Sequence, residues 1–76
     1  MADYKYSDFL ERSLDEVFDK LYHPAAKTPY SGIYRCHECG REAVSIVNRE
    51  LPSQNHHQHA ANAGPIRWRL IIRRKL

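Results

Sequence analysis

The sequence lacks the long apolar segments that would place a protein in or across a membrane. It has no run of about 18 apolar residues, and no apolar segment near its start resembles a secretory signal. It also has only two cysteines. In a reducing compartment, two thiols spaced C-x-x-C are more typical of metal ligands or redox groups than of a structural disulfide. We therefore expect a cytoplasmic protein without membrane attachment.

The chain is also short of residues for a large core. Its 76 residues make one domain at most, and no internal repeat is visible. A chain of this size buries only about 60% of its unfolded surface. Small domains of this kind often depend on a bound metal or on self-association. Either form of support is expected from size alone.

The charge is unevenly distributed along the chain. Residues 1–22 carry six acids against three bases, a net charge of −3, whereas the remainder carries nine bases and three acids, a net charge of +6. Five of those bases fall in the last ten residues. This polarity predicts electrostatic attraction between the two parts, or between two copies of the chain.

An amphipathic helix is predicted from Ser7 to about Tyr22. Its apolar residues recur at steps of three and four, which places them on one helical face: Phe9, Leu10, Leu14, Val17, Phe18 and Leu21. Ser7 is a suitable N-cap, a later start at Ser13 is the competing reading, and Pro24 ends the pattern. The apolar face is expected to pack on the rest of the domain or to dock a partner.

Strand patterns follow a proline- and glycine-containing linker. A short strand at Ile33–Arg35 enters the cysteine turn and a second, Ala43–Val47, leaves it. After a polar loop and the turn signal Gly64–Pro65, apolar residues alternate with arginines from Ile66 to Arg73. The sequence therefore predicts an α+β fold, with an N-terminal helix followed by a three-stranded antiparallel sheet.

A tetrahedral metal site is predicted at the cysteine pair. Cys36 and Cys39 stand three positions apart and can both reach one ion, and Gly40 allows the chain to turn back. His56 and His59 repeat this offset, giving C-x2-C-x16-H-x2-H. Thiolate and imidazole ligands together favour a structural Zn²⁺.

Other ligand sets stay open. His57 is an alternate ligand for His56, whereas His37 within the turn and His23 near the helix end are left out of the site. In the alternative without metal, Cys36 and Cys39 are reduced thiols on a hairpin and the histidines belong to a solvated loop.

A catalytic role is not expected from this motif. Thioredoxin-like chemistry places the first cysteine at the start of a helix, but strand patterns flank this pair. A catalytic zinc needs an open position beside an acid or base. Glu38 or Glu42 would be the available groups, but the chain has no bulk to form a pocket around them. We therefore predict a non-enzymatic protein.

The segment Tyr34–Gly40, preceded by Ser31-Gly32-Ile33, resembles the zinc knuckle of zinc-ribbon and rubredoxin-like proteins. The wider string, with LPSQNHHQH and GPIRWRL, is similar to small bacterial proteins of unassigned function. The resemblance covers about residues 30–72 and implies a zinc-ribbon-like domain there. Together with the helix pattern, it divides the chain into a helix and linker over residues 1–29 and a zinc-ribbon-like domain over residues 30–76. This sequence departs from the family pattern at the second knuckle, where histidines stand in the region of the usual C-x-x-C.

Two kinds of partner fit this expectation. We predict first a binding module that mediates protein–protein interaction or self-association, with the helix face docking a protein partner or a second copy. The alternative is a nucleic-acid-binding zinc ribbon that contacts phosphates through a basic last strand. Its contact residues would be Arg67, Arg69, Arg73 and Arg74, with the first three on one side of the strand.

Overall fold

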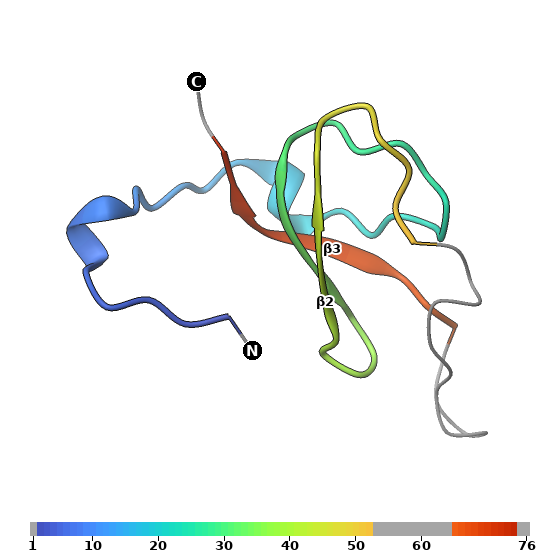
Figure 1. Cartoon of the computed structure of the whole chain (residues 1–76), viewed down its shortest axis with the longest axis horizontal. Coiled ribbons are helices and arrows are strands. Elements are labelled where there is room, and N and C mark those ends of the chain that lie inside the picture. Colours follow the sequence, from blue (N-terminus) through green and yellow to red (C-terminus); the bar gives the residue numbers. More distant parts are fainter. Residues whose placement is uncertain (1, 53–64, 75–76) are drawn as a thin grey trace.

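The chain forms a small three-stranded antiparallel sheet with a long N-terminal arm (Figure 1). The computed structural model describes residues 2–52 and 65–74. The strands are β1 (Gly32–Cys36), β2 (Glu42–Ser45) and β3 (Trp68–Arg73). Two short 3-10 turns precede them, η1 (Ser7–Phe9) and η2 (Glu16–Asp19).

Strand β1 lies in the middle of the sheet, in the order β2-β1-β3. Tyr34 pairs with Ala43 on one side and with Leu70 on the other. The register of β1 and β3 shifts between Ile33 and Tyr34, because Ile72 pairs with the first and Leu70 with the second. Ile71 is therefore an extra residue in β3, and it reverses the alternation of faces beyond that point.

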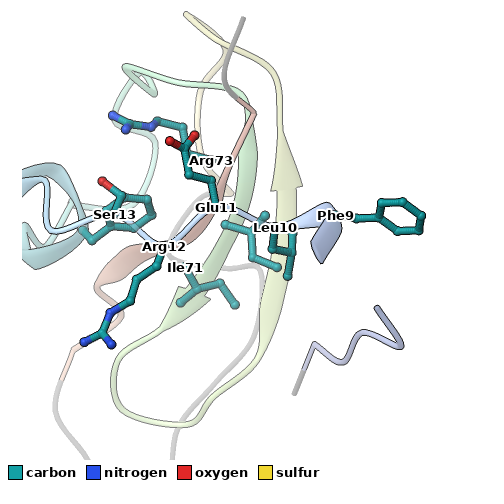
Figure 2. Close-up of a pocket in the computed structure, with 9 residues that line it drawn as sticks. Phe9, Leu10, Glu11, Arg12, Ser13, Ile71 and Arg73 are labelled. Carbon is teal, nitrogen blue, oxygen red and sulfur yellow. The ribbon is translucent and has the colours of Figure 1, made fainter. Parts of the chain in front are cut away.

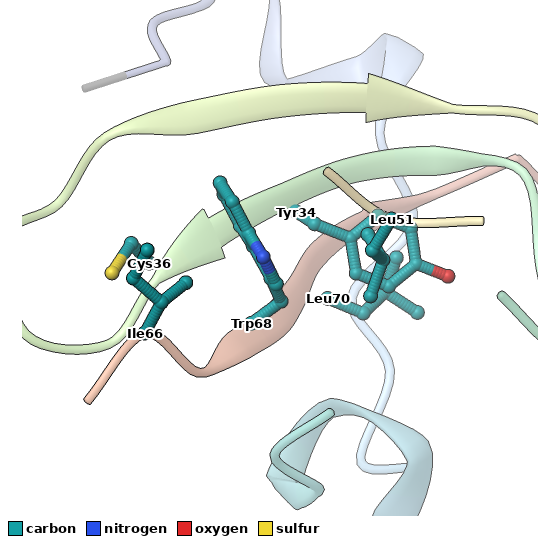
Figure 3. Close-up of a cluster of buried hydrophobic side chains, with 6 residues drawn as sticks. All are labelled: Tyr34, Cys36, Leu51, Ile66, Trp68 and Leu70. Carbon is teal, nitrogen blue, oxygen red and sulfur yellow. The ribbon is translucent and has the colours of Figure 1, made fainter. Parts of the chain in front are cut away.

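The inner face of the sheet carries the core (Figure 3). Cys36 and Ile66 lie at one end of the cluster, and Tyr34, Leu51 and Leu70 lie at the other. Trp68 lies between these two groups. The buried apolar residues are Tyr34, Cys36, Leu51, Ile66, Trp68 and Leu70. Alternation along β1 and β3 places these strand residues on one face, as a half-buried sheet requires.

Segments from both ends of the chain close this core. Tyr22 and Trp68 exchange two backbone hydrogen bonds of 2.8 and 2.7 Å, which attaches the N-terminal part to the outer edge of β3. The Tyr22 ring meets the Tyr34 ring edge-on at 6.2 Å. Burial raises the pKa of both phenols, so they are neutral hydrogen-bonding groups at physiological pH.

The loops on the other side are joined through Thr28, a buried polar residue. Its hydroxyl donates to the carbonyl of Ile46 at 2.8 Å, and its backbone N–H donates to the carbonyl of Arg49 at 2.9 Å. Ser45 also donates its hydroxyl to that of Thr28. These bonds satisfy the buried hydroxyls of Thr28 and Ser45. The Leu51 N–H donates to the carbonyl of Ala26 at 2.8 Å, which holds Leu51 beside the same loop.

The predicted N-terminal helix is wrong. Within residues 2–22 only η1 and η2 are helical, and the residues that cap them are extended. Ser13 Oγ accepts from the Asp15 N–H, and Asp15 Oδ1 accepts from the Val17 N–H, each at 3.1 Å. Such local side-chain bonds compete with helical hydrogen bonds. The extended pairing of Tyr22 with β3 also excludes a continuous helix there.

The α+β class is corrected accordingly to a mostly β fold. Its described secondary structure is the antiparallel sheet and two 3-10 turns, with no helix of seven or more residues in the described part of the chain. None of the described helices has the length and apolar character that a bilayer crossing requires.

Replacing Gly32 by alanine should destabilise the sheet. A Cβ at this position would lie 2.0 Å from the carbonyl oxygen of Ile72, so the backbones of β1 and β3 would have to separate. We expect Gly32→Ala to lower the free energy of unfolding by about 2 kcal/mol or more in urea denaturation. The control Val44→Thr, at a position that is 81% exposed, keeps a β-branched side chain and should change it by less than about 0.5 kcal/mol. An unchanged unfolding midpoint for Gly32→Ala would contradict this close approach.

Candidate functional site

The cysteine motif forms the turn between β1 and β2. Cys36 ends β1 and is fully buried, whereas Cys39 lies in the turn and is exposed. The Gly40 N–H donates to the Cys36 carbonyl at 2.9 Å, and the Cys36 N–H donates to the Arg41 carbonyl at 2.7 Å. Gly40 has a φ of 78°, a conformation that side chains disfavour, and this lets the chain reverse after Cys39. Both cysteines therefore belong to one tight backbone reversal.

A positive charge packs against the back of this turn. A Cβ on Gly40 would lie 2.9 Å from a guanidinium nitrogen of Arg35, so the Arg35 side chain covers the glycine. On the other side, the His37 N–H donates to the Arg67 carbonyl at 2.8 Å, which fixes the start of β3 beside the turn. Two soft thiol donors in a fixed reversal fit one side of a tetrahedral zinc site.

The histidines predicted to complete the site, His56, His57 and His59, lie outside the described residues. Across residues 2–52 and 65–74, no group of three or more histidine, cysteine or acidic side chains gathers at one point. His23 and His37 are both exposed. Of the predicted ligand set, the structure places Cys36 and Cys39 in one turn, the first buried and the second exposed, and the metal site stays a prediction.

The arginines predicted for nucleic-acid binding do not share one face. Arg69 pairs with Arg35, on the outer face of the sheet, whereas Arg73 pairs with Gly32 and so points to the inner face. The extra residue Ile71 separates the two and reverses the alternation. The predicted common side for Arg67, Arg69 and Arg73 is therefore wrong for Arg73. Arg74 is exposed.

Arg73 instead holds the N-terminal part to the sheet. Its guanidinium forms an ion pair of 2.9 Å with Asp15 and lies 5.3 Å from the centre of the Phe18 ring and 4.9 Å from that of Tyr30. The Val17 N–H and, second to it, Arg73 lower the pKa of Asp15 below its ordinary value of 3.8. The hydrogen bond to Asp15 raises the pKa of Arg73. We call these contacts the Arg73 latch.

The outer face of the sheet carries two rows of side chains. Ile33 pairs with Val44 and Ile72, so these three residues form an apolar row across all three strands, which we call the outer row. Val44 is 81% exposed. In the next row, Arg35 lies between Glu42 and Arg69. The outer face thus carries an apolar row and, next to it, a charged row with two arginines and one glutamate.

A groove of about 380 Å³ borders this face at the end of β3 (Figure 2). Leu10 of the N-terminal arm and Ile71 and Ile72 of β3 supply much of its apolar wall, and the ring of Phe9 points away from it. Because Ile72 belongs both to the outer row and to the groove, the two surfaces are continuous.

Sequence reasoning missed the Arg73 latch and the outer row. Both depend on the bulge in β3. The available signal was the run Leu70-Ile71-Ile72, because three consecutive apolar residues interrupt the strict alternation that precedes them. The close approach at Gly32 had no comparable signal, since it depends on where the backbone of β3 lies.

Comparison with curated proteins gives a match over part of the chain. The chain is 50% identical to "Protein L" of Escherichia coli over 52 residues, which are 68% of this chain and 59% of that protein. The chain thus spans less than two thirds of the length of the curated protein it matches. No family model and no solved structure matches the chain.

The Arg73 latch should depend on the charge of Asp15. Because the folded pKa of this carboxyl is lowered, its contribution to stability is present above the ordinary value of 3.8 and is lost as the pH falls through the lowered value. In an NMR titration of the Asp15 Cγ and the Val17 N–H, the midpoint should lie below 3.8. Arg73→Gln should raise it, but not to 3.8, because the Val17 bond remains.

The neighbouring substitution Arg74→Gln serves as the control and should leave the midpoint unchanged. An Asp15 midpoint that is the same in the wild type and in Arg73→Gln would show that the ion pair does not form in solution.

Proposed function

We propose that this chain is a small, non-enzymatic binding module, stapled by a structural zinc ion, that mediates protein–protein interaction or self-association in the cytoplasm. The observation that carries the proposal is the outer row, an apolar strip of Ile33, Val44 and Ile72 on the solvent side of the sheet. The outer face of the sheet takes the place of the predicted helix face as the binding surface.

The composition of the outer face supports a protein partner. Apolar side chains on the open face of a sheet are usually covered, because water contact with β-branched surface is unfavourable. Ile46, two residues after Val44, is also 61% exposed and extends the apolar surface. An apolar row with a charged row of Arg35, Glu42 and Arg69 beside it combines the apolar and polar contacts that protein interfaces use.

The zinc ion is proposed as the support of this surface. Cys36 and Cys39 would hold one side of it, and two of the three predicted histidines would complete the site. When bound, the ion supplies folding free energy, since small domains gain stability from a metal that the unfolded chain does not bind. Cys36 pairs directly with Trp68, so a ligand at this position would fix the end of the core that the fold depends on.

Nucleic-acid binding is the second candidate, favoured by the basic border of the outer face. Arg35 and Arg69 are cross-strand neighbours, and Arg67 lies two residues before Arg69, on the same face by alternation. Three arginines on one face match a set of phosphate contacts. The apolar row beside these arginines is the reason to prefer a protein, because phosphates gain nothing from contact with Val44 or Ile72.

Zinc binding is tested by native mass spectrometry of the full chain. We expect one zinc ion per chain in the wild type and its loss in Cys36→Ser and in Cys39→Ser, because a serine hydroxyl is a poor replacement for a thiolate ligand. His23→Ala, at an exposed position outside the predicted ligand set, should retain the ion. Chelation should lower the thermal unfolding temperature of the wild type. A metal-free wild type whose unfolding is insensitive to chelator would overturn the zinc proposal.

The binding surface is tested by affinity capture from a bacterial lysate, with the wild type and Val44→Asp as matched baits. A protein retained by the first and lost with the second should then bind the purified wild type in calorimetry. Val47→Asp, the same substitution at an exposed position outside the outer row, should retain it. Capture that a nuclease abolishes would favour the nucleic-acid candidate, and equal capture by all three baits would refute the role of the outer face.

A further inference from the structure

The N-terminal arm, residues 2–14, exposes a second set of large apolar side chains. Tyr4 is 66% exposed, Tyr6 54%, Phe9 79% and Leu14 87%, and η1 buries no residue. Figure 1 shows the arm running away from the sheet. One chain therefore leaves apolar side chains exposed on two surfaces, the arm and the outer row, where Val44 is exposed and Ile33 and Ile72 are partly buried.

The two surfaces are complementary in charge. The arm carries three acids (Asp3, Asp8 and Glu11) against two bases (Lys5 and Arg12), a net charge of −1. The outer face has the opposite balance, since Arg35 and Arg69 border the outer row with Glu42 as the one acid of that row of side chains. The arm, aromatic and of net negative charge, thus fits a face that has an apolar row and a charged row of net positive charge.

The geometry allows the arm to reach such a face. Thirteen residues span at most about 3.3–3.6 Å each when extended, whereas neighbouring strands of a sheet lie only about 4.8 Å apart. The arm leaves the sheet at the end of the edge strand β3, because the Arg73 latch holds Asp15, the residue that follows the arm, at that place. The groove lined by Leu10 and Ile72 leads from there to the outer row.

From these observations we propose that two copies of this chain exchange their N-terminal arms, so that the arm of each copy covers the outer row of the other. This inference rests on the proposed function and names a second copy as its partner. A twofold arrangement uses the same contact twice and covers all four exposed surfaces at once. Exchange of a segment that is already extended needs no refolding of the sheet.

The test is sedimentation equilibrium of the full zinc-treated chain up to about 1 mM, a range that detects even weak dimers. We expect a concentration-dependent dimer. Val44→Asp on the face and Phe9→Asp on the arm should each weaken it at least about tenfold, or 1.4 kcal/mol. Val47→Asp should leave it unchanged. Phe9 lies in a segment with no buried residue, so Phe9→Asp tests the contact without disturbing the fold.

The identity of the contact is tested by isotope-filtered NMR on a mixture of labelled and unlabelled chains. Nuclear Overhauser effects between the Phe9 or Tyr6 ring of one copy and the Val44 methyls of the other are expected. A monomer at all concentrations, a dimer insensitive to both acidic substitutions, or contacts found only within one chain would each overturn arm exchange.

Failure of arm exchange is distinguishable from failure of the proposed function. If the chain is monomeric but Val44→Asp still loses a captured protein, the outer face binds a different protein and only the second copy is excluded. If the chain is monomeric and capture is indifferent to Val44→Asp, the outer face has no binding role and both proposals fail.

Discussion

The position of Trp68 is the constraint on which the rest of the structure depends. Its indole is fully buried in the middle of the core, and its backbone exchanges two hydrogen bonds with Tyr22 while it pairs with Cys36 across the sheet. An aromatic ring of this kind removes roughly 150–250 Å² from water, which is a large share of what so small a domain can bury. One residue thus fills the core, joins the N-terminal part to the sheet and sets the place of the cysteine turn.

The stability of the molecule is distributed unevenly around this centre. The sheet and the Thr28 loops are closed by backbone hydrogen bonds and buried side chains. The arm before Asp15 has no buried residue among those described, and the ion pair of Asp15 with Arg73, flanked by two aromatic rings, lies at its junction with the sheet. Ion pairs near a surface contribute little individually. The arm is therefore the part that moves at least cost while the sheet keeps its shape.

The sequence predicted the strands well and the N-terminal part poorly, for physical reasons. Alternation is visible in a strand, so β1, β2 and β3 lie close to where the pattern places them. The helix pattern of Phe9 to Leu21 was equally regular. Spacing alone does not show that the side chains of Ser13 and Asp15 accept hydrogen bonds from nearby backbone N–H groups, or that Tyr22 pairs with β3. At the candidate site, the cysteine turn followed from its motif. The position of Arg73 on the inner face could not be predicted from the sequence, because it depends on the bulge in β3, and a bulge is a property of two paired strands.

The pairing of Tyr22 with Trp68 has a consequence for the order of folding. The hairpin of β1 and β2 is local, but the core it faces is completed by partners from opposite ends of the described chain. During synthesis Tyr34 and Cys36 are made long before β3, and loops this long close slowly. Until Trp68 has left the ribosome, the inner face of the hairpin stays in water, where it is a target for chaperones and for association with other nascent chains.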